Sequence, residues 1–222
     1  NFSINAGLEY EMNDKIAFSL YLGRGMRSPD MTERYIKFLT VGFDNYDYLG
    51  NPSLKPETNN QADFITDINA GKAGKLKLDL FASLVNNYIT GVKQFNNAGN
   101  AYFYGFDASY NSARYHGFGA VLAATFTYAI LEKATKNIIE DGQVTGQVEV
   151  ENDAVNEIPP LEARVNLNYV CLSEKLQFNA GLRFAAAQNH VSEAFYEETT
   201  PAYTLVDASL AYKPVKWMSF SA

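Results

Sequence analysis

The sequence predicts an all-β fold, an antiparallel up-and-down transmembrane β-barrel. Three observations predict it: apolar and polar residues alternate with period two, most alternating segments exceed ten residues, and short connections alternate with long ones. Soluble strands average about five or six residues, whereas a tilted strand that crosses a membrane needs roughly 9–11. The segment lengths therefore favour a membrane barrel over a soluble sandwich.

The alternation is clearest between Leu176 and Phe184, where every second residue is apolar and the residues between include Asn179 and Arg183. The segment from Leu161 to Tyr169 repeats the pattern. No segment shows a convincing helical period. The same criterion predicts strands near 1–11, 15–25, 58–70, 75–95, 101–111, 117–131, 158–171, 175–187 and 202–213, with a tenth beginning near 217.

The connections support a meander with one tight end and one elaborate end. Outer-membrane barrels have short periplasmic turns and longer extracellular loops, and a Greek-key sandwich has no reason to alternate in this way. The short turns are predicted near 12–14, 71–74, 112–116, 172–174 and 214–216, and the longer loops near 26–57, 96–100, 132–157 and 188–201. Within 132–157, Asp141-Gly142 predicts a hairpin between Ile138 and Glu151.

Aromatic residues mark the predicted membrane boundaries. Tyrosine lies on the apolar face where four of the predicted strands reach a short turn, as an interfacial girdle requires. These residues are Tyr10, Tyr110, Tyr169 and Tyr212, with Trp217 at the next turn, and Tyr88 and Tyr128 are candidates for a girdle at the other end. The opposite face is expected to line a wet interior; it carries Asp63, Asp67, Asp79, Glu162, Arg164, Arg183 and Asp207.

Both ends of the sequence fall inside alternating segments, so we expect one partial barrel domain over 1–222 whose strands continue beyond it. Cys171 is the single cysteine and excludes an intrachain disulfide. No nucleophile elbow, P-loop or metalloprotease helix is present, so the chain is predicted not to be an enzyme, and no cofactor is expected. No nucleic-acid partner is expected either.

Four local motifs resemble the barrel domain of TonB-dependent outer-membrane receptors, over essentially the whole chain. The most specific is Gly50-Asn51-Pro52-Ser53-Leu54-Lys55-Pro56-Glu57, which is similar to the sequence where a long loop of that family returns to the barrel. The others are Arg24 to Asp30 followed by Thr32 to Tyr35, then Gly105-Phe106-Asp107, then Asn156 to Arg164 with its Ile-Pro-Pro.

The resemblance implies a barrel of 22 strands around an N-terminal plug, of which this chain supplies about ten strands and no plug. It implies a receptor in the bacterial outer membrane that imports a scarce solute, such as a metal or metal chelate, into the periplasm. The implied partners are the TonB complex, which acts through the missing plug, outer-membrane lipid, and the small solute. From position alone, Arg24 and Glu57 are expected to pair at the rim, because they flank the same loop.

The long loops supply the candidate binding residues. Aromatic side chains beside acceptors can hold a sugar or a cationic chelate, although they can equally pack a loop on itself. The candidates are Met26, Arg27, Tyr46, Asp47, Tyr48, His190 and Tyr196. Met26 and Met31 form a weaker metal hypothesis, since thioether sulfur suits copper(I) and the set loosely resembles the copper receptors of the family.

Loop charge favours a cationic solute. The loop 132–157 holds seven acidic residues against two lysines, and 188–201 holds three glutamates without Lys or Arg. An acidic rim attracts cations and repels anions. Two other functions stay open: a passive porin-type channel, and a soluble secreted β-protein that binds carbohydrate. The sequence does not identify the solute, the oligomeric state, or the plug.

Overall fold

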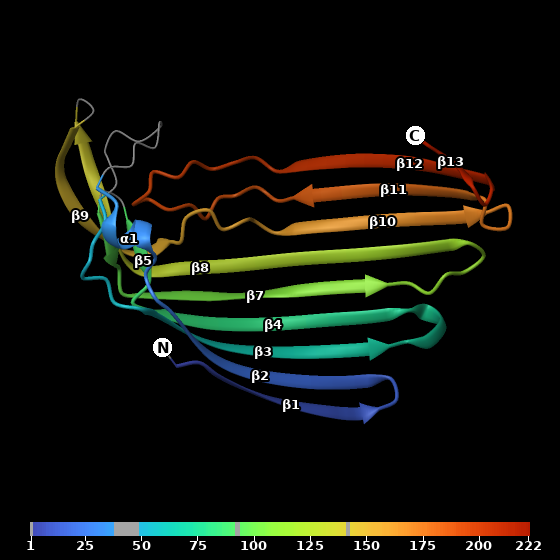
Figure 1. Cartoon of the computed structure of the whole chain (residues 1–222), viewed down its shortest axis with the longest axis horizontal. Coiled ribbons are helices and arrows are strands. Elements are labelled where there is room, and N and C mark those ends of the chain that lie inside the picture. The colour runs from blue at the N-terminus through green and yellow to red at the C-terminus, as the bar shows by residue number, and fades with distance from the viewer. Residues whose placement is uncertain (1, 38–48, 92–93, 141–142) are drawn as a thin grey trace.

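A computed structural model, which describes residues 2–37, 49–91, 94–140 and 143–222, forms one curved antiparallel sheet of eleven strands (Figure 1). The strand order is β1-β2-β3-β4-β7-β8-β10-β11-β12-β13, with β9 paired to β8. Along this order, each strand pairs with the strand that comes before it and the strand that comes after it in the sequence, as an up-and-down meander requires; β5, β6 and β9 are set apart. The sheet does not close on itself, so the chain forms part of a barrel wall, and the predicted fold class is confirmed.

Most strands of the sheet are long and lie within the predicted ranges, and the exceptions are given below. Their bounds are β1 Ile4–Asn13, β2 Ile16–Arg27, β3 Glu57–Asn69, β4 Lys75–Asn86, β7 Asn100–Asn111, β8 Phe118–Glu140, β9 Gln143–Ala154, β10 Glu162–Cys171, β11 Leu176–Ala185, β12 Tyr203–Val215 and β13 Met218–Ser221. The smaller elements are the helix α1 (Met31–Tyr35), the 3-10 turn η1 (Gly71–Ala73), and the paired strands β5 (Ile89–Gly91) and β6 (Phe95–Asn97).

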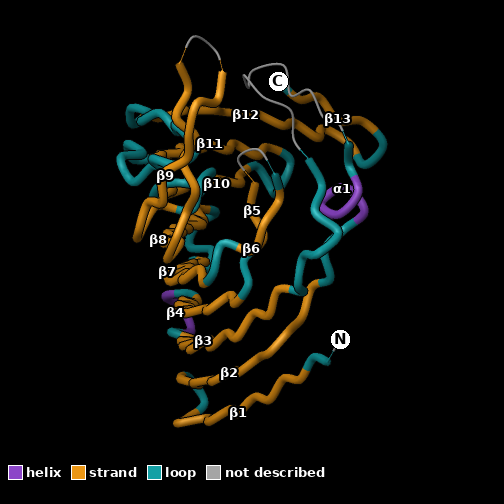
Figure 2. Tube along the Cα trace, turned by 90° about the vertical axis from the view of Figure 1, so that its left-hand side faces the viewer, coloured by secondary structure: helices purple, strands orange, loops and turns teal. Residues whose placement is uncertain are grey.

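Strand register separates the residues into two faces. Leu80 of β4 lies opposite Phe64 of β3 and Phe106 of β7, and these apolar rows continue along every strand. On the other face, Asp79 lies opposite Asp107. Figure 2 shows that the sheet is an arc and that α1 lies on its concave side. The polar face meets α1 through Arg27, so the polar face is concave and the apolar face is convex.

The convex face is an uncovered apolar surface. Leu8 is 69% exposed and Val206 is 76% exposed, and no second sheet covers either row in the described residues. A soluble protein does not leave such a face in water, whereas lipid covers it in a barrel. Buried apolar residues gather instead at the loop end of the sheet; they are Ala101, Ala129, Leu131, Ala134, Val155 and Ala194.

The girdle at the turn end is confirmed in position. Tyr10 lies opposite Phe18 and Tyr212 opposite Leu176, on the convex face beside the short turns. At the loop end the prediction of Tyr88 is wrong, because β4 ends at Asn86 and Tyr88 turns to pack against Phe103 on the concave face.

Three predicted segments differ from the structure. The predicted strand 75–95 ends at Asn86, because Asn87 takes a φ of 55° and the chain then forms the hairpin β5–β6. The predicted loop 132–157 is mostly strand, since β8 runs on to Glu140 and pairs with β9; this pairing confirms the hairpin predicted between Ile138 and Glu151 but begins it earlier. The helix α1 was not predicted. None of the described helices is long and apolar enough to cross a membrane.

Candidate functional site

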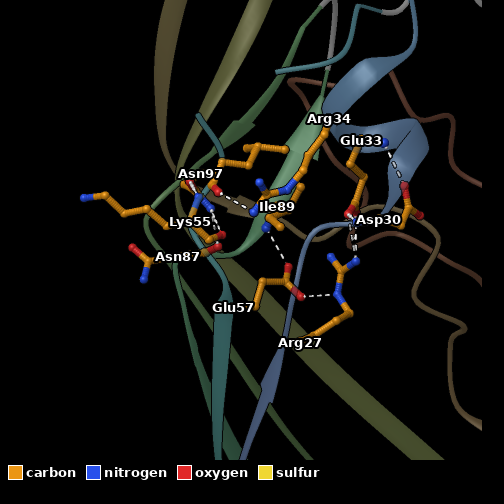
Figure 3. Close-up of polar contacts among 10 residues, drawn as sticks. Arg27, Asp30, Glu33, Arg34, Lys55, Glu57, Asn87, Ile89 and Asn97 are labelled. Carbon is orange, nitrogen blue, oxygen red and sulfur yellow. Dashed lines mark hydrogen bonds and ion pairs between the residues drawn. The ribbon is translucent and has the colours of Figure 1, made fainter. Parts of the chain in front are cut away.

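The concave mouth of the wall is organised by Arg27, the last residue of β2. Arg27 lies opposite Glu57 in the β2–β3 register, and its Nε donates to Glu57 Oε2 over 2.6 Å. Its Nη1 donates to both carboxylate oxygens of Glu33 on α1, each at 2.9 Å (Figure 3). The Glu33 and Glu57 side chains are only 13% and 11% exposed, so water screens them weakly. One guanidinium thus joins the rim of the sheet to the helix.

Glu57 also holds the β5–β6 hairpin. Its second oxygen, Oε1, accepts the backbone N–H of Ile89 over 2.6 Å. Asn97 of β6 completes the attachment, because its Nδ2 donates to the carbonyls of Lys55 and Asn87 and its Oδ1 accepts from the Lys55 N–H. Figure 3 shows these groups meeting where β2, β3 and the hairpin converge. The hairpin and α1 are therefore both fixed over the concave face.

The helix α1 is only five residues long and depends on its cap. Asp30 accepts the Glu33 N–H over 2.7 Å, and Glu33 accepts the Asp30 N–H over 2.7 Å, which is a capping box. Glu33 therefore caps the helix and binds Arg27 at once. The pattern Asp30-x-x-Glu33 is the signal in the sequence that identifies this helix; a period cannot appear in so few residues.

The motif from Gly50 to Glu57 packs the returning loop against α1. The Gly50 N–H donates to the Ile36 carbonyl over 2.7 Å, and a Cβ on Gly50 would lie 2.6 Å from the Arg34 carbonyl carbon. Arg34 in turn donates to the Leu54 carbonyl. Only glycine permits this approach. The motif therefore shapes the mouth, and Pro52 and Pro56 stiffen the returning loop because each fixes its own φ.

The predicted pairing of Arg24 with Glu57 is wrong. Register places Arg24 opposite Asn60, and Arg24 Nη1 donates to Asn60 Oδ1 over 3.1 Å. Arg24 and Arg27 are three residues apart, so they point to opposite faces of the strand. Glu57 faces the concave side and meets Arg27, whereas Arg24 faces the convex side. The sequence alone does not supply the register that decides between them.

A second cluster fixes the loop between β11 and β12. Asp153, at the end of β9, accepts three bonds: from Ser192 Oγ at 2.6 Å, from the Glu193 N–H at 2.8 Å, and from the Ala194 N–H at 3.1 Å. Asp153 and Ser192 are 6% and 1% exposed. Because a buried carboxylate needs donors, this loop is held firmly on the base of the β8–β9 hairpin. The local sequence around Asp153 does not indicate that this residue binds the loop between β11 and β12.

The candidates His190 and Tyr196 belong to the same loop. His190 stacks on Tyr128 with ring centroids 4.0 Å apart, and its Nε2 lies 3.0 Å from the Ala129 carbonyl. Tyr128 faces the convex side but is covered by this ring rather than by lipid. The Tyr196 hydroxyl donates to the Asn137 carbonyl, and Lys136 Nζ lies 5.1 Å from the Tyr196 ring centroid. Both candidates therefore fasten the loop.

Lys136 strengthens this attachment. Its Nζ lies 2.7 Å from Glu193 Oε1, and the hydrogen bond to that carboxylate raises the pKa of Lys136 above its ordinary value. The pair is largely in water, so its contribution to stability is small.

The remaining candidates are dispersed. Met26 faces the convex side of β2, where its sulfur accepts the Phe2 N–H, whereas Met31 is 73% exposed on α1 at the concave side. Tyr46, Asp47 and Tyr48 lie outside the described residues. No group of three or more His, Cys, Asp or Glu residues capable of holding a metal ion occurs in the described ranges. His116 and His190 lie at opposite ends of the sheet, so they cannot share a metal ion.

The concave wall carries charged residues of both signs. Asp79 and Asp107 lie opposite each other on β4 and β7, and Arg164 and Arg183 lie opposite each other on β10 and β11. The two pairs border one hollow of about 330 Å³. No ion pair joins them among the described residues, and Asp79 Oδ1 is buried without a hydrogen-bond partner there. Lys77 lines the same hollow beside the two aspartates, and Glu162 lines it beside the two arginines, so the wall offers both carboxylates and cations to whatever fills the bore.

Comparison with protein-family models gives one match, described as "TonB dependent receptor-like, beta-barrel", over residues 1–222. The chain belongs to this family. Family members are outer-membrane β-barrels of Gram-negative bacteria that act as transport receptors rather than enzymes. A search of curated protein sequences finds no match. The resemblance inferred from the four motifs is thereby confirmed for this TonB-dependent receptor barrel.

Solved structures agree with the family. The copper transporter OprC shares the fold with a TM-score of 0.75 and 18% identity, over 98% of this chain and 32% of OprC. A variant of the ferric enterobactin receptor PfeA from Pseudomonas aeruginosa gives 0.70 and 15%, over 100% of this chain and 34% of PfeA. The ferric yersiniabactin receptor FyuA from Yersinia pestis gives 0.66 and 15%, over 99% and 30%.

These likenesses establish the fold of this TonB-dependent receptor barrel. At such identities they do not carry a solute from one protein to another. The chain spans about a third of the length of the structures it matches.

Proposed function

We propose that this chain forms part of the wall and the extracellular mouth of an outer-membrane receptor, which imports a scarce solute into the periplasm under the control of the TonB complex. The full receptor would hold its plug in segments other than 1–222. The observation that carries the proposal is the Arg27 cluster. It holds α1 and the β5–β6 hairpin over the concave, polar side of the wall, where a solute entering the bore would pass.

The solute class we propose is a metal ion or metal chelate. Copper and ferric chelates are what the similar structures are named for. The β8–β9 hairpin supports a cationic solute, since it carries Glu140, Glu149 and Glu151 at the mouth, and among the described residues only Glu149 has an ion-pair partner, Lys133. Such a field raises the local concentration of cations.

The candidate contacts form two groups within this proposal. Tyr46, Asp47 and Tyr48 belong to the first long loop of the sequence, as does Met31, whose side chain is exposed. Arg27, His190 and Tyr196 already bond to the protein, so they would act on the solute mainly by fixing the loops. Met26 and Met31 lie on opposite faces of the wall, so a copper(I) site would need Met31 with ligands other than Met26.

The test measures uptake of labelled copper and of a labelled ferric chelate by cells that carry the full receptor, with and without a functional TonB complex. A receptor gives saturable uptake of one of the solutes that disappears without TonB. A passive channel, the alternative, gives uptake proportional to concentration and indifferent to TonB, and that result would reject the proposal. A triple change, Tyr46→Ala, Asp47→Asn and Tyr48→Ala, should reduce uptake while leaving membrane assembly intact.

A further inference from the structure

A row of polar side chains crosses the convex face, which is otherwise apolar. Arg24, Asn60, Asn86 and Asn100 come from the four neighbouring strands β2, β3, β4 and β7. Arg24 lies opposite Asn60, and Asn86 lies opposite Asn100. The next convex residues toward the turn end are apolar or aromatic on all four strands; they are Leu22, Ala62, Leu84 and Tyr102. The row therefore marks the edge of the apolar band on the loop side.

Hydrogen bonds join the four side chains in one direction. Arg24 Nη1 donates to Asn60 Oδ1 at 3.1 Å, Asn60 Nδ2 to Asn86 Oδ1 at 3.1 Å, and Asn86 Nδ2 to Asn100 Oδ1 at 2.8 Å. A guanidinium has no acceptor, so Asn60 must present its oxygen to Arg24, and this choice fixes the orientation of each following amide. The direction of the row is thus set by its first residue.

In this direction the side-chain oxygens of the three asparagines all accept a hydrogen bond, whereas several of their N–H groups remain as donors. Each amide oxygen accepts from its neighbour, whereas the second N–H of Asn86 and both of Asn100 reach no acceptor in the part of the chain that the structure describes. Arg24 is exposed, and no carboxylate among the described residues lies within 4 Å of it. A row of donors with a cation at one end attracts an anion.

The height of the row matches the surface of a membrane. On β4 the convex leucines run from Leu76 to Leu84, eight residue steps, and Asn86 follows. At about 3.3 Å per residue and a tilt of about 40°, this run is roughly 20 Å tall, close to the apolar band of about 25 Å in outer-membrane barrels. Asn86 and its row therefore lie level with the lipid head groups, which carry phosphate.

We propose that the row Arg24–Asn60–Asn86–Asn100 binds the phosphate of an outer-leaflet lipid, with Arg24 donating to the phosphate oxygens. Planar guanidinium donors match phosphate geometry, and the amides hold Arg24 in place while supplying further N–H groups. The inference rests on the membrane placement in the proposed function, but it does not depend on any transported solute. None of the described acids pairs with Arg24, and Glu132, which lies on the convex face of β8 level with Asn100, is at the opposite end of the row from Arg24.

The test uses the purified full receptor and native mass spectrometry. The probes are lipid A that carries its phosphates, the same lipid A with its phosphates removed, and inorganic phosphate as competitor. The wild type should retain the phosphorylated lipid about tenfold better, the size expected for one charge-assisted contact. Arg24→Gln should abolish this preference. Arg114→Gln, which removes an exposed arginine at the turn end, should preserve it.

Several results would overturn the inference. They are a wild type without preference for phosphorylated lipid, an Arg24→Gln variant that keeps the preference, and displacement of the lipid by equimolar inorganic phosphate. Should Arg24→Gln fail to assemble, Asn100→Leu takes its place, since it removes donors without touching Arg24. A several-fold reduced preference in this variant supports the row, and an unchanged preference rejects it. A receptor that imports its solute normally yet shows no lipid preference would reject this inference alone.

Discussion

Arg27 and Glu57 lie opposite each other at the ends of β2 and β3, and Arg27 Nε donates to Glu57 Oε2 over 2.6 Å. The pair does more than join two strands. Glu57 also accepts the Ile89 N–H, and Arg27 also binds Glu33. A helix and a hairpin, far apart in sequence, are thus anchored by one ion pair at the rim.

Removing the Arg27 charge should loosen both anchored elements. Arg27→Met leaves Glu33 and Glu57, both mostly buried, without their counter-charge. An unpaired buried carboxylate is costly, and we expect about 2 kcal/mol after allowing for the half-exposed arginine. Hydrogen exchange of the full receptor should then rise in 31–35 and 89–97, with β10 and β11 unchanged.

The Glu57→Gln variant serves as the comparison for this prediction. It removes the charge but can still accept the Ile89 N–H through its amide oxygen. Because Arg27 also keeps its bonds to Glu33 in this variant, exchange should rise less in both α1 and β5–β6 than it does in Arg27→Met. If neither variant changes exchange at the mouth, the cluster does not anchor it.

Gly105 tests the close packing of the wall. A Cβ at this position would lie 1.9 Å from the Phe126 carbonyl oxygen and 2.8 Å from the Phe81 ring. Backbone cannot yield by that much without breaking the β7–β8 ladder, so Gly105→Val should prevent assembly of the barrel. Electrophoresis of membrane fractions with and without heating reports assembly, because folded barrels migrate differently.

Gly25 is the matched control for Gly105. It lies in β2, and a Cβ there meets nothing within 4 Å. Gly25→Ala should assemble as the wild type does. Equal assembly of the Gly105→Val and Gly25→Ala variants would show that the close contact between the Gly105 and Phe126 backbones is not required for the barrel to assemble.

Asp153 should control the loop between β11 and β12. Asp153→Asn replaces one acceptor oxygen by a donor that faces Ser192 and Ala194, so at least one of three buried bonds is lost, at a cost of about 2 kcal/mol. Limited proteolysis should then cut within 188–199. Glu151→Gln, at an exposed position of the same strand, should leave the loop resistant. A loop equally resistant in both variants would remove Asp153 from this role.

The sequence predicts the wall of the barrel well and its mouth poorly, for a physical reason. Along β11, lipid on one side and water on the other impose strict alternation from Leu176 to Phe184. Above the membrane both faces of β8 meet water or protein, so the pattern weakens after Leu131; the hairpin near Asp141-Gly142 was predicted, but the continuous strand from Leu131 to Ile138 was not. The alternation of apolar and polar residues arises from contact with lipid on one face, so it is lost where a strand extends beyond the membrane.

The errors at the mouth have a second cause, because they depend on contacts between distant segments. Whether Arg24 or Arg27 meets Glu57 follows from register, which the local sequence does not encode. The roles of Asp153 and Ser192 likewise appear only when β9 meets a loop 39 residues later. The capping box of α1 was accessible, since Asp30 and Glu33 are close in sequence.

The most direct test of the account asks which way the strand faces point. Single cysteines at Leu78, Leu80 and Leu84, and at Lys77, Phe81 and Ser83, are introduced on β4 of the full receptor in a Cys171→Ser background and spin-labelled in lipid bilayers. The leucine positions should be reached by dissolved oxygen and shielded from a water-soluble nickel complex, and the alternate positions should show less oxygen access. Equal or reversed accessibility of the two rows would contradict an apolar face turned to lipid.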